Sequence, residues 1–162
     1  VSDCASCSAM LKNYPLLLEN QPAWEEQAKN VAETTFDITE IVEKNIDQLV
    51  TQPVARVRIA WDDPCELIHA QGRAKSPVNS LKRIPGLEII NLPESDWCCG
   101  SAGAFMLKYP DIADQILQRK INNIVGLNLD FVLTSNPGCY LHLKRGLKKE
   151  GVKTKVAYRR ID

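Results

Sequence analysis

Two adjacent cysteines stand near the middle of the chain, in the stretch Asp96–Gly103 with the sequence DWCCGSAG. A disulfide between neighbouring cysteines closes a strained ring, because relaxed disulfides hold their two Cα atoms farther apart than one peptide unit does. The thiols of Cys98 and Cys99 therefore need partners elsewhere, or they face a common metal. Gly100 follows at once and gives the backbone room to turn.

The other four cysteines are unevenly spaced: Cys4 and Cys7 lie near the start, and Cys65 and Cys139 flank the central pair. Six cysteines could form three disulfides in a secreted protein, and a free cysteine is often only a small core residue. Disulfide frameworks mostly serve small domains with little core, whereas this chain has 162 residues, of which 44% are hydrophobic. We therefore favour reduced, metal-binding thiols over disulfides or inert packed cysteines.

Charge and composition restrict the class of partner. Twenty basic residues balance twenty acidic ones, so no strong field indicates nucleic acid or an anionic membrane surface. No apolar run approaches the roughly 18 to 20 residues of a membrane span, and no signal peptide opens the chain. We expect a cytoplasmic protein, peripheral at the inner face of a membrane through its partners. The start at Val1, inside a cysteine motif, predicts a fragment of a longer polypeptide.

Strands and helices are predicted to alternate along the chain. The predicted strands are Val57–Trp61, Leu87–Leu92, Phe131–Thr134 and Lys155–Tyr158. The predicted helices are Ser8–Tyr14, Ala23–Leu49 with a break at Phe36–Thr39, Ser76–Ile84, Ala102–Lys108, Asp111–Val125 and Tyr140–Lys149. This alternation predicts an α/β fold with a mainly parallel sheet and flanking helices.

The later cysteines all follow predicted strands. Cys65 comes after the first strand, Cys98 and Cys99 after the second, and Cys139 after the third, at a helix start. Ligands in open α/β sheets bind beyond the carboxyl ends of the strands, where loops from different strands meet. We therefore expect the four sulfurs to lie within a few ångströms of one another. Helix amino termini beside them would favour the thiolate form that binds metal.

The two histidines are weaker candidates. His69 lies four residues after Cys65 and could contact a ligand, although a loop histidine bonded to backbone is an equal alternative. His142 lies on the helix after Cys139, where a surface position is expected.

A short internal similarity links the two ends of the chain. Aligning Cys7 with Cys139 places the segment DCASCSAMLKNY on SNPGCYLHLKRG. In this register Cys4 corresponds to Asn136, so only the first copy contains C-x-x-C. The alignment predicts one structural element used twice, with chance similarity as the alternative.

The motifs around the cysteines resemble those of a known family. DPC, LPESDWCCGSAG and TSNPGCYLHLK resemble the cysteine-rich CCG domain found in one subunit of heterodisulfide reductase and in its relatives. HAQG and IPGLE look most like the iron-sulfur subunit of glycolate oxidase, with the lactate-utilisation iron-sulfur protein close behind. The resemblance implies that residues 1–50 are the tail of a first CCG repeat with a long helical connection. Residues 51–162 would be the second CCG repeat.

The resemblance also implies a cofactor site, because family members bind a non-standard iron-sulfur cluster or zinc. The implied ligands of a 4Fe-4S type cluster, with zinc as the alternative, are Cys65, Cys98, Cys99 and Cys139. Cys4 and Cys7 would be ligands of the first repeat and are expected to lie apart from the Cys98 site. Asn136 replaces one cysteine of the family pattern, which lowers the thiol count of the second site from five to four.

The function implied by the resemblance is electron transfer. The chain would be part of the iron-sulfur subunit of a 2-hydroxy-acid dehydrogenase of the glycolate type. It would pass electrons from a flavin-containing dehydrogenase subunit to an acceptor, as a component without catalytic residues of its own. The alternative is a zinc-binding or metal-free docking module between subunits. Neither interpretation involves nucleic acid or a direct membrane span.

Overall fold

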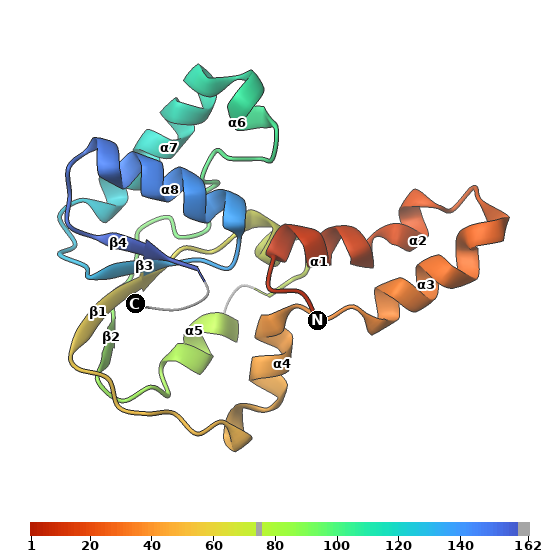
Figure 1. Cartoon of the computed structure of the whole chain (residues 1–162), viewed down its shortest axis with the longest axis horizontal. Coiled ribbons are helices and arrows are strands. Elements are labelled where there is room, and N and C mark those ends of the chain that lie inside the picture. The colour runs from red at the N-terminus through yellow and green to blue at the C-terminus, as the bar shows by residue number, and fades with distance from the viewer. Residues whose placement is uncertain (74–75, 159–162) are drawn as a thin grey trace.

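A four-stranded parallel sheet forms the centre of the protein in this computed structural model, which describes residues 1–73 and 76–158 (Figure 1). The strand order is β2-β1-β3-β4. The bounds are β1 Val57–Trp61, β2 Leu87–Ile89, β3 Phe131–Leu133 and β4 Lys155–Ala157. Ile59 of β1 pairs with Ile89 on one side and Phe131 on the other. The predicted α/β class with a parallel sheet is confirmed.

Helices cover both faces of this sheet (Figure 1). On β1, Ala60 points to one apolar cluster, whereas Ile59 and Trp61 point to the other, as the alternation of side chains along a strand requires. The first cluster contains residues of α7 (Pro110–Ile124) and α8 (Pro137–Lys149). The second contains residues of α1 (Ala5–Lys12), the π-helical segment η3 (Glu66–Ala70) and α5 (Ser76–Leu81).

The helical stretch predicted before the sheet, Ala23–Leu49, is interrupted, as expected. Its parts are the 3₁₀ turn η1 (Pro22–Trp24), α3 (Glu25–Thr34), α4 (Ile38–Lys44) and the 3₁₀ turn η2 (Ile46–Gln48). The break occurs because Asp37 caps α4, forming a capping box with Glu40. A further short helix, α2 (Tyr14–Leu17), pairs with α3 in an arm that projects from the sheet (Figure 1). Within the described ranges, no helix is both long and apolar enough to cross a bilayer.

Two helices begin earlier than predicted, and both carry cysteines. α1 begins at Ala5 rather than Ser8, since the Cys4 side chain caps it, and α8 begins at Pro137 rather than Tyr140, since Asn136 caps it. Cys139 therefore lies inside the first turn of α8. The strand β2 and the helices α5 and α6 (Phe105–Lys108) are shorter than predicted.

A buried ion pair joins α7 to the carboxyl edge of the sheet. Lys120 Nζ lies 2.5 Å from Asp62 Oδ1 and donates a hydrogen bond to the carbonyl oxygen of Ser95 at 2.8 Å. Both charged side chains are 1% exposed. Burial raises the pKa of Asp62, and the charge and hydrogen bond of Lys120 oppose that rise. Asp62 follows β1 and Ser95 lies in the loop after β2, so one ammonium group fixes both loops.

The expected surface position of His142 is wrong. The residue is 1% exposed, because it lies on the stripe of α8 that faces α7, and its Nε2 lies 3.4 Å from the carbonyl oxygen of Ala113. Burial lowers the pKa of His142, with the nearby charge of Arg145 acting in the same direction. The neutral imidazole is thus the form that the fold favours.

Replacing Lys120 with methionine should be strongly destabilising. Lys120→Met leaves the Asp62 carboxylate buried without its counter-charge, which typically costs about 3 to 5 kcal/mol of unfolding free energy. Urea unfolding followed by circular dichroism measures this loss. The matched control is Lys29→Met, which removes an exposed i,i+4 ion pair with Glu25 and should leave stability nearly unchanged.

The double variant Lys120→Met/Asp62→Leu tests the cause of that loss. Removing both charges abolishes the uncompensated carboxylate, so the double variant should be more stable than Lys120→Met alone. A double variant no more stable than the single one would show that the charge of Asp62 is not the reason for the destabilisation.

The stability of the fold should depend on the titration of His142. Burial of the neutral imidazole gives His142 a folded pKa below its ordinary value near 6.5. The unfolding free energy therefore has its full value above about pH 6.5 and decreases as the pH falls toward the folded pKa, because protonation favours the unfolded state. The variant His142→Gln should therefore lose less unfolding free energy than the wild type between pH 7.5 and pH 5.5, roughly the range over which a histidine titrates. Equal losses in the two proteins would contradict this assignment.

Candidate functional site

A cavity of about 420 Å³ lies beyond the carboxyl ends of the strands, and cysteines contribute much of its wall. Five of the six cysteines line it, namely Cys4, Cys65, Cys98, Cys99 and Cys139. The structure thus brings together the four residues that the sequence placed after three different strands. It also adds Cys4, which the sequence did not place there.

Each of the four predicted thiols comes from a turn or helix start that follows a strand. Cys65 immediately precedes η3, which begins a few residues after β1. Cys98 and Cys99 lie in the loop between β2 and α6, and Cys139 is the third residue of α8. The parallel sheet directs all three connections to the same edge, because parallel strands have their carboxyl ends on one side.

Gly100 allows the CCG loop to pass close to α7. Its φ of +84° lies in the left-handed region, and a Cβ atom there would lie 2.7 Å from the carbonyl oxygen of Ala113. The backbone N–H of Gly100 donates a hydrogen bond to the Cys98 sulfur at 3.3 Å. Glycine is therefore required both for the turn and for the approach of the loop to the helix.

The four thiols form a continuous series of contacts. The Cys99 and Cys139 sulfurs lie 2.6 Å apart, shorter than the roughly 3.5 to 4 Å between thiolates of a tetrahedral zinc site. Cys99 also contacts the Ser101 hydroxyl at 3.4 Å. Cys65 and Cys98, and likewise Cys98 and Cys99, lie close enough for each thiol to shift the pKa of the other. All six cysteines of the chain are free thiols.

Interactions between these thiols give them different pKa values. The interaction with Cys65 is the largest cause that lowers the pKa of Cys98, and the interaction with Cys99 is the next. The positive charge of Lys120 acts in the same direction. The same pairing raises the pKa of Cys65, and the contact with Cys139 is the first cause of a raised pKa at Cys99. Cys98 is therefore the thiol of this set that most readily becomes a thiolate, the form that binds metal.

The size of the cavity and its donors indicate what could fit. In liquid water one molecule occupies roughly 30 Å³, far less than this cavity. Within the described part of the chain, no group of three or more His, Cys, Asp or Glu side chains is arranged to hold one metal ion. By its volume, this thiol-lined cavity has room for a group of several atoms, with sulfur as the main donor.

The expectation that Cys4 lies apart from the Cys98 site is wrong. Cys4 is on the cavity wall because α1 begins beside α8, where the N–H of Ala5 donates to the carbonyl oxygen of Ser135 at 3.1 Å. Burial is the main cause that raises the pKa of Cys4 to about 11. Cys7, by contrast, is exposed and lies outside the wall.

Asn136 lines the cavity, but its side-chain amide makes hydrogen bonds that stabilise the fold. Its Oδ1 accepts a hydrogen bond from the N–H of Gly138 at 2.9 Å, and its Nδ2 donates to the Ser6 hydroxyl. Both ends of the amide are thus engaged in capping α8 and joining it to α1. His69 is exposed and does not line the cavity.

Sequence reasoning missed the buried pair beneath the site. A lysine in an amphipathic helix normally suggests a surface position. However, Lys120 falls between Leu117 and Ile124 on the stripe of α7 that faces the sheet, next to Ile121. That periodicity is the signal that could have identified it.

Comparison with known proteins agrees with this geometry. Residues 59–144, just over half of the chain, match the family described as the CCG cysteine-rich domain. Lactate utilization protein A of Geobacillus sp. (strain WCH70) is 30% identical over 161 residues, and these cover 98% of this chain and 66% of that protein. One subunit of the fumarate reductase (CoM/CoB) of Methanothermobacter marburgensis is 35% identical over 153 residues, covering 94% of this chain and 29% of that protein.

A further relative is the uncharacterized protein YkgE of Escherichia coli K12, 27% identical over 158 residues that cover 98% of this chain and 66% of that protein. The chain thus spans about two thirds of the length of two of these relatives and less than a third of the other. The matched segment contains all four cysteines that follow the strands. On this match, and on the parallel sheet whose loops bring those thiols together, the chain belongs to the CCG cysteine-rich domain family.

Proposed function

We propose that the chain is an electron-transfer component that holds an iron-sulfur cluster of the 4Fe-4S type. The observation that carries this proposal is the cavity lined by the thiols of three separate loops. Iron-sulfur clusters are held mainly by cysteine thiolates, commonly four of them. A space of about 420 Å³ has room for such a cluster and exceeds what a single zinc ion needs.

The proposed ligands are Cys65, Cys98, Cys99 and Cys139. When bound, the cluster would supply one-electron redox chemistry. The protein holds the four sulfurs in place and orients them through the loops described above. The Gly100 N–H bond to Cys98 and the buried charge of Lys120 both stabilise negative charge at that sulfur.

We further propose that this component belongs to a 2-hydroxy-acid dehydrogenase of the glycolate type. It would receive electrons from a flavin-containing subunit and pass them to an acceptor. Support comes from the names of two relatives, one concerned with lactate, itself a 2-hydroxy acid, and the other part of a reductase. The substrate would bind to the flavin subunit, so the chain needs no catalytic residue of its own.

The division into residues 1–50 and 51–162, as the end of one CCG repeat and a complete second one, is also a proposal. It is supported by a repeated backbone pattern. The N–H of Ser2 donates to the carbonyl oxygen of Phe36 at 2.8 Å, and the N–H of Thr134 donates to that of Ala157 at 3.1 Å. Ser2 and Thr134 each stand two residues before the capping residue of a helix, so both helices follow a strand-like pairing in the same register.

Metal analysis of protein purified without oxygen tests the cluster directly. We expect a coloured protein containing iron and sulfide, with an electron paramagnetic resonance signal in one oxidation state. The proposal predicts that this signal disappears in Cys65→Ser. A colourless wild-type protein with stoichiometric zinc, or with no metal, would instead support the docking module.

Substitution of the CCG pair should separate the cluster from the flavin chemistry. In the complete complex, Cys98→Ser or Cys99→Ser should lower acceptor-linked turnover and iron content at least about tenfold. Flavin reduction by substrate in the partner subunit should continue, because that step precedes the cluster.

Unfolding free energy provides the control for this experiment. A cysteine that is merely packed should tolerate serine with a loss of about 1 to 2 kcal/mol and no change in metal. Full turnover and full iron content in either variant would show that these cysteines have only a packing role.

A further inference from the structure

The thiol of Cys4 is the one sulfur on the cavity wall outside the four-ligand set. Cys4 is the residue before α1, in extended backbone conformation, and its sulfur accepts a hydrogen bond from the N–H of Cys7 at 3.3 Å. It reaches the cavity from the segment before the sheet, whereas the other four thiols come from the loops and helix starts that follow the strands.

Hydrogen bonds on both sides of Cys4 fix its position. The carbonyl oxygen of Asp3 accepts a hydrogen bond of 2.6 Å from the hydroxyl of Tyr158, the residue that follows β4. On the other side, the Ala5 N–H donates to Ser135 and the Ser6 hydroxyl accepts from Asn136. The residues next to Cys4 are therefore held by the β3–α8 connection and by the end of β4.

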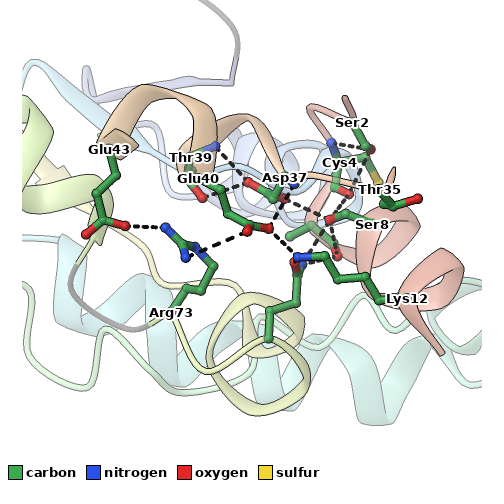
Figure 2. Close-up of polar contacts among 12 residues, drawn as sticks. Ser2, Cys4, Ser8, Lys12, Thr35, Asp37, Thr39, Glu40, Glu43 and Arg73 are labelled. Carbon is green, nitrogen blue, oxygen red and sulfur yellow. Dashed lines mark hydrogen bonds and ion pairs between the residues drawn. The ribbon is translucent and has the colours of Figure 1, made fainter. Parts of the chain in front are cut away.

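The rest of α1 is held by a polar network with α4 (Figure 2). The Ser8 hydroxyl donates to the Asp37 carboxylate at 2.8 Å, and both side chains are fully buried. One turn later, Lys12 forms an ion pair with Glu40, which in turn lies near Arg73. Because these contacts anchor the helix along its length, they hold the backbone of the cap residue Cys4 beside the cavity.

Cys4 and Asn136 are structural equivalents. Both are helix caps with similar backbone angles, φ −119° and ψ 111° for Cys4 and φ −126° and ψ 122° for Asn136. The two helices start side by side, and both caps line the same cavity. Both polar atoms of Asn136 are already engaged, so of the two caps only Cys4 presents a soft sulfur donor.

We propose that Cys4 is a fifth thiol ligand of the group held by Cys65, Cys98, Cys99 and Cys139. This inference rests on the proposed cluster and assigns Cys4 to the second site rather than to the first repeat. The site would then be composite, because the end of one segment completes the ligand set of the next. Coordination releases the thiol proton of Cys4, as it does for every thiolate ligand. The N–H of Cys7 can remain bonded to the sulfur, since hydrogen bonds to ligating sulfurs are a normal means of tuning a cluster.

The test compares Cys4→Ser, Cys7→Ser and Cys65→Ser in the full-length protein, purified and reconstituted with iron and sulfide without oxygen. Serine is a strong helix cap, so Cys4→Ser should keep α1 intact, and circular dichroism together with the unfolding midpoint checks this. The paramagnetic signal that is lost in Cys65→Ser identifies the cluster of this cavity. That signal, measured per protein, is the readout for the other two variants.

We expect Cys4→Ser to lower this signal about tenfold or more, or to change its g-values, while Cys7→Ser leaves it in place. An unchanged signal in Cys4→Ser overturns the inference but leaves the proposed cluster standing. Equal losses in Cys4→Ser and Cys7→Ser also overturn it, because an effect shared with an exposed neighbour would come from α1 as a whole. If the wild type gives no signal that depends on Cys65, the proposed cluster itself fails and the inference fails with it.

Discussion

The ammonium group of Lys120 is buried against the carboxylate of Asp62 and the carbonyl oxygen of Ser95, and the thiol cavity depends on this contact. Asp62 lies three residues before Cys65, and Ser95 lies three residues before Cys98. One charged group thus sets the spacing of two loops that share no secondary structure. A buried charge without a partner is costly, so the loops cannot separate from α7 without a large free-energy penalty.

The backbone of the CCG loop is held from the other side by steric constraint. Gly100 passes so close to the carbonyl oxygen of Ala113 that a side chain would collide with it. The two constraints act on the same helix, since Ala113 and Lys120 lie on one face of α7. Together they hold Cys98 and Cys99 on the cavity wall. The buried His142 lies against the same Ala113 carbonyl, which extends the packing of α7 to α8.

Beside the CCG loop, two helix starts also line the cavity. α1 and α8 begin next to each other, joined by the bonds of Ala5 to Ser135 and of Ser6 to Asn136. Helix amino termini carry a partial positive charge, which favours the negative thiolates between them. Part of the cavity wall therefore consists of loops that a buried ion pair fixes. Another part consists of the adjacent amino termini of α1 and α8.

The sequence by itself determined the alternation of strands and helices and the placing of Cys65, Cys98, Cys99 and Cys139 after strands. These features are local, because they follow from hydrophobic periodicity, from turn residues and from the rule that parallel strands end at one edge. Only the tertiary structure decided that Cys4 joins them and that the ammonium group of Lys120 pairs with Asp62. Both depend on contacts between residues far apart in the chain, Ala5 with Ser135 and Lys120 with Asp62, and periodicity carries no information on which distant surfaces meet.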